Sequence, residues 1–249
     1  MRQVDPARGI SLSTSPTREV VPWGATSTLE RPAWSPPNEH VLIQSDGTSL
    51  DAHAGEDQLY PVVKRAIDVV GASTMVVVAS PVIVAIALAV KLTSTGPIFF
   101  RQRRIGQSGR TFDIWKFRTM RSDTSAPVPA GQPHKFKRDP RVTPVGRVLR
   151  RMCLDELPQL WNVLVGDMSL VGPRPELPEI VAHYQPWQRA RHQVRPGLTG
   201  WWQINRDDDH LMHEATELDI YYVQHRSLRL DLEILARTAG AIAHGRGIY

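Results

Sequence analysis

The 249-residue chain contains 41% apolar and 22% charged residues, which is enough apolar material for a buried core and excludes disorder over its whole length. Its one cysteine, Cys153, excludes an intrachain disulfide and a cysteine-rich zinc site, and it favours a reducing compartment. A net charge of +5 indicates an anionic partner, which could be nucleic acid, lipid headgroups or a phosphorylated substrate.

The charge is divided unevenly between a tail and a body. Residues 1–60 hold four Lys/Arg against eight Asp/Glu, whereas residues 61–249 hold 26 against 17. The first segment is also rich in Pro, Ser and Thr and lacks a sustained period of 2 or 3.6 residues. We therefore expect a disordered acidic tail over residues 1–60, to which the sequence assigns no role.

An uncharged stretch follows the tail, from Val69 to Val90. As one straight helix it would measure roughly 33 Å, enough to cross the hydrocarbon core of a bilayer. Ser80-Pro81 lies at its middle, and a proline inside a helix removes one hydrogen bond and bends the helix. Each arm would then measure only about 14–18 Å, too short to cross alone.

Basic residues flank this stretch on both sides, with Lys64 and Arg65 before it and Lys91 after it. This pattern favours two ends on the same, cytoplasmic face. We therefore expect residues 61–93 to form a re-entrant helix-break-helix anchor, with a spanning helix and a soluble core helix as alternatives. Asp68 lies at the mouth of the segment, where a local ion pair with Lys64 or Arg65 would reduce its cost.

The remaining residues, 94–249, are expected to form a cytoplasmic body. Two short strands, 97–100 and 111–117, enclose a Gly-Gln-Ser-Gly turn and predict a β-hairpin. A proline-rich loop over 122–140 precedes a predicted helix over 144–152. The fold class expected is thus α+β and mainly helical: a monotopic membrane protein whose body contains a short hairpin.

The segment Leu154–Trp161 is the most informative. Four apolar residues in and just after this segment recur at helical spacing and should face the core: Leu157, Leu160, Trp161 and Leu164. Asp155 suits the N-cap of this helix, which would lower its pKa. With Glu156 it could form a metal and phosphate site beside the arginine-rich helix; a simple capping pair fits the spacing equally well.

Two turns present arginines that suit contact with phosphate. Arg174 stands between two prolines and therefore projects from a stiff turn, although an incidental surface charge is the alternative. Arg195 precedes a Pro-Gly turn that leads into Trp201-Trp202, which could belong to the core or to a membrane interface. The C-terminal helix predicted over 226–243 could lie on the membrane or pack on the body.

Other patterns are weaker. The acidic run 207–209, with His210, His213 and Glu214, resembles a metal cluster but matches no established ligand spacing, and a solvated loop is the simpler interpretation. The sequence contains no Walker A loop, no G-x-G-x-x-G and no nucleic-acid-binding motif, so we expect no nucleic acid as partner.

Taken together, six segments in this order resemble the bacterial sugar transferases, small monotopic polyprenyl-phosphate phosphoglycosyl transferases. The resemblance covers residues 61–249. The six segments are 64–68 (KRAID), 80–81 (SP), 115–120 (WKFRTM), 154–157 (LDEL), 166–175 (GDMSLVGPRP) and 195–201 (RPGLTGW).

This resemblance implies transfer of a sugar-1-phosphate from a UDP-sugar to a polyprenyl phosphate such as undecaprenyl phosphate, with release of UMP. It implies Asp155 as a covalent nucleophile, Glu156 as a support for the metal or the proton balance, and Mg²⁺ as the cofactor, held by both. Location would be the cytoplasmic face of the inner membrane, among membrane lipids. The sequence does not predict the oligomeric state. The expected phosphate-contacting residues are Lys116, Arg118, Arg150, Arg174 and Arg195; those of the anchor are Lys64, Arg65, Asp68, Ser80 and Pro81.

The product would begin the assembly of an exopolysaccharide, capsule, O-antigen or glycoprotein glycan. A membrane-anchored protein that binds polyanions without catalysis is the alternative function. The sequence names neither the sugar nor the glycan.

Overall fold

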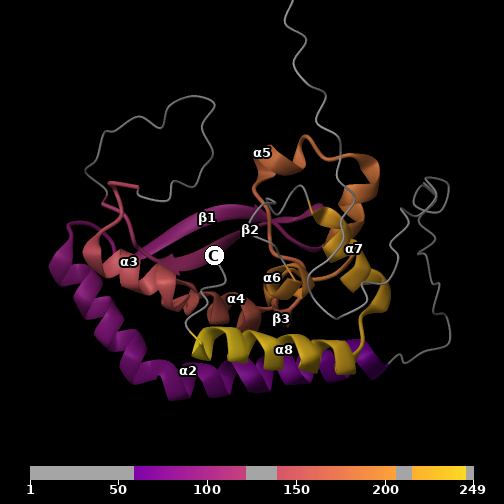
Figure 1. Cartoon of the computed structure of the whole chain (residues 1–249), viewed down its shortest axis with the longest axis horizontal. Coiled ribbons are helices and arrows are strands. Elements are labelled where there is room, and N and C mark those ends of the chain that lie inside the picture. The colour runs from indigo at the N-terminus through magenta and orange to yellow at the C-terminus, as the bar shows by residue number, and fades with distance from the viewer. Residues whose placement is uncertain (1–58, 122–138, 206–214, 245–249) are drawn as a thin grey trace, which may run out of the picture. The chain divides into compact units, whose positions relative to one another are not determined.

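The computed structural model describes residues 59–121, 139–205 and 215–244 (Figure 1). Almost all of the predicted tail therefore lies outside the described residues, as do most of the proline-rich loop and the acidic run 207–214. Leu59 and Tyr60, which we assigned to the tail, begin a helix instead.

The anchor segment forms one long helix, α2 (Leu59–Thr93), with Pro81 inside it. Figure 1 shows its two arms running in different directions, so the helix bends without being interrupted. Pro81 has no N–H to donate to the carbonyl of Val77, and the hydroxyl of Ser80 donates to that carbonyl instead, at 2.8 Å. The helix is therefore continuous through Pro81, without the break that we expected at Ser80-Pro81.

Most of the surface of α2 is apolar and uncovered. Within the described residues it is the one helix long and apolar enough to cross a membrane, and only 11% of its most apolar window is buried. Val77 and Val78 near the bend are more than 70% exposed. Such exposure in an aqueous environment would be costly, which supports membrane association of this helix.

The side of α2 that faces the body contributes to two cores. Ala72, in the first arm, joins a cluster built on Leu160, Val163 and Met168. In the second arm, Ile86 and Val90 pack with Phe117 and Leu149. The two arms are thus fixed to the body separately.

The predicted hairpin is present. Strands β1 (Phe99–Ile105) and β2 (Thr111–Phe117) pair antiparallel, with Phe99 opposite Phe117 and Arg103 opposite Asp113. The turn between them is a short 3-10 segment, η1 (Gln107–Gly109). The first strand begins at Phe99, two residues after the predicted start, and continues to Ile105.

The predicted helix over 144–152 is confirmed as α3 (Pro144–Arg151), whose N-cap Thr143 accepts from the amide of Gly146 at 2.9 Å. A 3-10 turn, η2 (Leu154–Glu156), and helix α4 (Gln159–Val165) follow. Leu160 is buried as expected. Trp161 is 58% exposed, so its assignment to the core was wrong.

A pair of short parallel strands packs against α4, and the sequence did not predict it. In this pair, β3 (Ser169–Val171) runs beside β4 (Gly197–Thr199), with Ser169 opposite Gly197 and Val171 opposite Thr199. A Cβ on Gly172 would collide with the carbonyl oxygen of Arg195, and a Cβ on Gly197 with the amide nitrogen of Gly172. Glycine at these positions therefore allows the two turns that carry Arg174 and Arg195 to come together.

The C-terminal half is helical and surrounds this pair. Helix α7 (Thr216–His225) contributes Tyr222 to the first core, and α8 (Leu228–Ala243) contributes Ile234, so α8 packs on the body. Figure 1 shows α8 alongside the first arm of α2. The elements of this half are α5 (Pro178–Val181), η3 (Pro186–Gln193), α6 (Trp201–Asn205), α7 (Thr216–His225) and α8 (Leu228–Ala243).

Candidate active site

The adjacent carboxylates Asp155 and Glu156 form the centre of the site. Both belong to η2, between α3 and α4, and they are 6% and 5% exposed. The preceding Cys153 has a left-handed backbone, with φ of 56°, which turns the chain sharply out of α3. The sequence suggested Asp155 as the N-cap of α4, and this expectation is wrong. Pro158 occupies that position.

Two cations hold Glu156. Lys116 Nζ donates to its Oε1 at 2.6 Å, and Arg174 donates to Oε1 at 2.7 Å and to Oε2 at 3.3 Å. Burial alone would raise the pKa of Glu156, but the charges and hydrogen bonds of Arg174 and Lys116 outweigh it and lower that pKa to about 2. Glu156 is therefore ionised at neutral pH and fully engaged.

Asp155 has the opposite environment. Its Oδ1 is buried and has no hydrogen-bond partner among the described residues. Burial, and then the charge of Glu156, raise its pKa, while Lys116, Arg150 and Arg174 partly offset this rise. The expectation that a helix start lowers the pKa of Asp155 is thus wrong, because Asp155 does not begin the helix and its burial dominates.

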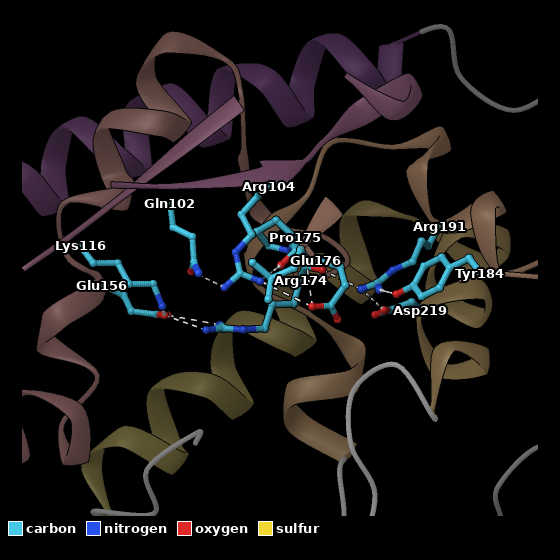
Figure 2. A network of polar contacts seen from close by, with 11 residues as sticks. Gln102, Arg104, Lys116, Glu156, Arg174, Pro175, Glu176, Tyr184, Arg191 and Asp219 are labelled. Carbon is cyan, nitrogen blue, oxygen red and sulfur yellow. Dashed lines mark hydrogen bonds and ion pairs between the residues drawn. The ribbon is translucent and has the colours of Figure 1, made fainter. Parts of the chain in front are cut away.

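Arg174 is held in place from behind. Arg191 Nη2 donates to the backbone carbonyl of Arg174 at 2.7 Å, and the same nitrogen lies 2.6 Å from Asp219 Oδ2 (Figure 2). Arg191 also donates to the hydroxyl of Tyr184. Because Arg191 and Asp219 are 1% exposed or less, this ion pair fixes the turn that carries Arg174.

A second arginine lies on the other side of the same turn. Arg104, on β1, donates to the carbonyl of Pro175 at 3.4 Å and lies 3.5 Å from Glu176 Oε1. Burial and the charge of Arg174 lower the pKa of Arg104 to about 10. Figure 2 shows Arg104 between the Lys116–Glu156–Arg174 group and the Arg191–Asp219 pair. The site thus concentrates positive charge around a few buried carboxylates.

Side chains of strand β2 and of the two residues after it make contacts in three different places. Lys116 reaches Glu156, whereas Arg118 donates to Ser94 O at 2.7 Å and to Ser94 Oγ at 2.8 Å, at the end of α2. Thr119 Oγ1 accepts from Arg150 Nε at 2.9 Å. The residues predicted to contact phosphate therefore do not all lie together. Lys116 and Arg174 meet at Glu156, while Arg118 joins the body to the membrane helix.

Arg150 and Arg195 form no hydrogen bond or ion pair with Asp155 or Glu156 in the part of the chain that the structure describes, and Arg150 donates to Thr119 instead. Arg150 is half-buried, and its charge acts on Asp155. Arg195 is half-buried and precedes β4, beside Gly172. The phosphate role of Arg150 and of Arg195 stays a prediction.

The charged residues of the anchor attach α2 to the body instead of pairing with one another. Lys64 Nζ lies 2.8 Å from Asp231 Oδ2, and Arg65 donates to the carbonyls of Val163 and Leu164 at the end of α4. The expected local ion pair of Asp68 is wrong, because its carboxylate accepts from two groups of β3. These are Ser169 Oγ at 3.0 Å and Leu170 N at 2.9 Å.

The expected metal site can be compared with the donors present. No group of three or more His, Cys, Asp or Glu side chains in the described parts of the chain could hold an ion alone. Asp155 Oδ1, buried and unpartnered there, suits a cation. Mg²⁺ commonly binds one or two carboxylates together with substrate phosphates, so one protein carboxylate is compatible with it. Glu156, held by Lys116 and Arg174, is poorly placed to be a second ligand.

Sequence reasoning missed Arg104, Glu176, Arg191 and Asp219. Arg191 and Asp219 lie on different elements and form no short motif, so their pairing has no local signal. Glu176 directly follows the Gly-Pro-Arg-Pro turn and could have been noted as its acidic neighbour.

A buried carboxylate pair with cations around it, on a body joined to an exposed apolar helix, is the arrangement of a membrane-associated protein that can hold anionic groups. The comparisons with known proteins identify the family. The model of the bacterial sugar transferase family matches residues 59–245, and the chain belongs to this family.

Curated relatives have related names. The chain is 44% identical over 186 residues to the UDP-glucose:undecaprenyl-phosphate glucose-1-phosphate transferase of Escherichia coli. This alignment covers 70% of the present chain and 39% of the Escherichia coli protein. It is 39% identical to the UDP-N-acetylgalactosamine-undecaprenyl-phosphate N-acetylgalactosaminephosphotransferase of Aeromonas hydrophila, covering 76% and 45%. It is also 39% identical to the exopolysaccharide production protein ExoY of Sinorhizobium fredii, covering 75% and 88%. The chain thus spans less than half of the first two relatives and most of the third.

Proposed function

We propose that this protein is a phosphoglycosyl transferase that moves a sugar-1-phosphate from a UDP-sugar to a polyprenyl phosphate such as undecaprenyl phosphate. Family membership and the names of the relatives support this assignment. The reaction would supply the lipid-linked sugar that begins an exopolysaccharide or a related glycan, in line with the name of the ExoY relative.

The observation that carries the proposal is the contrast between the two adjacent carboxylates. Glu156 is locked by Lys116 and Arg174, whereas Asp155 presents a buried oxygen without a partner in the described parts of the chain. Two titratable neighbours with opposite environments take different roles. Glu156 positions the cations, and Asp155 is available to react.

In the first step, an oxygen of the Asp155 carboxylate attacks the phosphorus that bears the sugar. The bond from this phosphorus to the bridging oxygen breaks, and UMP leaves with that oxygen and its electron pair. In the second step, a phosphate oxygen of the lipid attacks the same phosphorus and the carboxylate of Asp155 departs. The product is a polyprenyl-diphosphate sugar, and the enzyme is regenerated.

The raised pKa of Asp155 assists the attack. A more basic carboxylate is a stronger nucleophile once ionised, and its charge is only partly offset by Arg150 and Arg174. Arg174, oriented by Arg191, lies next to the reacting carboxylate with its planar guanidinium, which suits contact with phosphate oxygens. Mg²⁺, held by Asp155 with the diphosphate, would neutralise phosphate charge.

In this proposal the anchor would hold the site at the depth of the lipid phosphate. We propose that α2 enters and leaves the inner membrane on the cytoplasmic side, with Pro81 at its deepest point. The bend within α2, the basic residues at both ends and the attachment of both arms to one body support this arrangement. UDP-sugars are cytoplasmic metabolites, so the site would face its soluble donor.

The test is UMP release by the detergent-solubilised protein with Mg²⁺, polyprenyl phosphate and a panel of UDP-sugars. One sugar should support turnover, and Asp155→Asn should abolish it. Gln107→Ala, an exposed turn variant of the same hairpin, should leave it intact. A polyanion-binding protein without catalysis would release no UMP from any donor, and that result would refute the assignment.

A further inference from the structure

The hairpin has two faces, and the site uses only one of them. Lys116 and Arg104 extend from one face toward Glu156 and Glu176. On the opposite face, the alternation of side chains along a strand groups Phe99, Arg101 and Arg103. Their partners across the strands are Phe117, Trp115 and Asp113 in turn. The candidate active site does not account for the residues on this second face.

The second face borders an open groove of about 1010 Å³. Its lining combines aromatic rings with cations: Phe99 and Trp115 meet edge to face at 6.0 Å, and the Arg101 guanidinium lies over the Trp115 ring at 5.1 Å. Arg103 is 71% exposed in its side chain, and Phe99 is 40% exposed. We call the set of Lys91, Phe99, Arg101, Arg103, Asp113 and Trp115 the hairpin groove.

The hairpin groove adjoins the membrane helix. Lys91 belongs to the last turn of α2 and lines the groove, and its neighbour Leu92 is 83% exposed. Only five residues separate the end of α2 from β1, and they span at most about 18 Å. A groove this close to the end of a membrane-embedded helix lies near the polar surface of the bilayer.

We propose that the hairpin groove binds the headgroups of anionic phospholipids, so that the hairpin is a second membrane contact beside α2. Three cations oppose one carboxylate, Asp113, which gives the groove a positive charge. Tryptophan beside basic residues is the composition found where proteins meet the interface of a bilayer. Lysine and arginine near that surface attract anionic lipid.

This inference rests on α2 lying in the membrane and not on the chemistry of Asp155. The proposed lipid contact and the proposed transferase activity can therefore be refuted independently of each other. Arg101→Glu/Arg103→Glu should release UMP in detergent at the rate of the unaltered protein, because both side chains lie on the face away from Glu156.

The experiment measures quenching of Trp115 by brominated lipid. The full chain is placed in nanodiscs of phosphatidylcholine with about 30 mol% phosphatidylglycerol, a typical anionic fraction. Bromine is carried either by the phosphatidylglycerol or by an equal amount of the phosphatidylcholine, so the two bilayers have the same composition. The Trp115 signal is the difference between the protein and its Trp115→Phe variant.

We expect brominated phosphatidylglycerol to quench Trp115 about twofold more than brominated phosphatidylcholine. Arg101→Glu/Arg103→Glu should abolish this excess. Arg110→Glu/Arg189→Glu changes the net charge equally at exposed sites outside the groove and should retain it. If the glutamate pair does not fold, Arg101→Gln/Arg103→Gln decides, and it should reduce the excess at least by half.

Three results would overturn the proposal. Equal quenching by both lipids would show contact without recognition of the anionic headgroup. Absence of quenching by either lipid would show that Trp115 faces water, a second copy or another protein. Retention of the excess in the Arg101 and Arg103 variants would assign the recognition to other residues.

Discussion

Neutralising the two adjacent carboxylates should change stability in opposite directions. Glu156 has a pKa of about 2 in the folded protein against an ordinary value of 4.5. This difference corresponds to about 3 kcal/mol of stability. Because the folded-state pKa is lowered, that stability is present above pH about 4.5 and is lost as the pH falls toward 2.

Glu156→Gln removes this stabilisation and takes from the buried Lys116 and Arg174 the carboxylate to which both donate. Breaking a buried ion pair from one side costs about 3–5 kcal/mol. In a domain of this size each kcal/mol lowers Tm by roughly 2–4 °C, so Tm should fall by about 6–20 °C at neutral pH.

Asp155→Asn should act the other way. Its raised folded-state pKa means that the ionised carboxylate destabilises the fold at neutral pH, and that this cost disappears at low pH, where the carboxyl is protonated. The variant should therefore raise Tm by a few degrees at pH about 7, and the gain should vanish near pH about 4.

Thermal unfolding in detergent, followed by circular dichroism at both pH values, measures the pair of effects. Arg189→Gln, an exposed charge variant on η3, is the matched control and should leave Tm unchanged. Equal destabilisation by Glu156→Gln and Asp155→Asn would contradict the different environments assigned to the two carboxylates.

Three further predictions concern geometry. Arg174→Lys keeps the charge but loses the planar fork, so kcat should fall about a hundredfold, and near-normal turnover would make Arg174 a point charge only. Asp219→Asn should lower kcat about tenfold with little change in KM, because Asp219 acts through Arg191; rescue by Asp219→Glu would support this positioning role, and an equal loss in KM would oppose it. Pro81→Ala should straighten α2 and change the cysteine accessibility of its flanks in a Cys153-free background, whereas unchanged labelling would show that Pro81 does not set the topology.

Local signals made much of the fold predictable. The bend at Pro81 follows from the missing N–H of proline, and the hairpin from a Gly-rich turn between two short apolar runs. The helix over 144–152 is a local element too, and the structure adds the N-cap of Thr143 and the first-turn position of Pro144. In each case the deciding residues are close together in the sequence.

The features that the sequence analysis missed or predicted wrongly depend on residues far apart in the sequence. Strands β3 and β4 have three residues each and lie among glycines and prolines, so no period could reveal them. The pKa of Asp155 depends on where α4 begins, and the sharp turn at Cys153 moves that start to Gln159. Burial then outweighs the helix terminus. Trp161 was also misassigned, because helical spacing does not distinguish a helix face that packs on a core from one that is exposed.

The covalent role of Asp155 is the central claim, and intact-protein mass spectrometry with UMP quantification tests it most directly. The protein receives its preferred UDP-sugar and Mg²⁺ without any polyprenyl phosphate. The account predicts about one UMP per active site and a mass gain of one sugar phosphate located on Asp155. Both signals should be absent in Asp155→Asn and reduced at acidic pH, because the raised pKa leaves Asp155 protonated there. UMP release only after the lipid acceptor is added, with no adduct, would contradict the covalent mechanism.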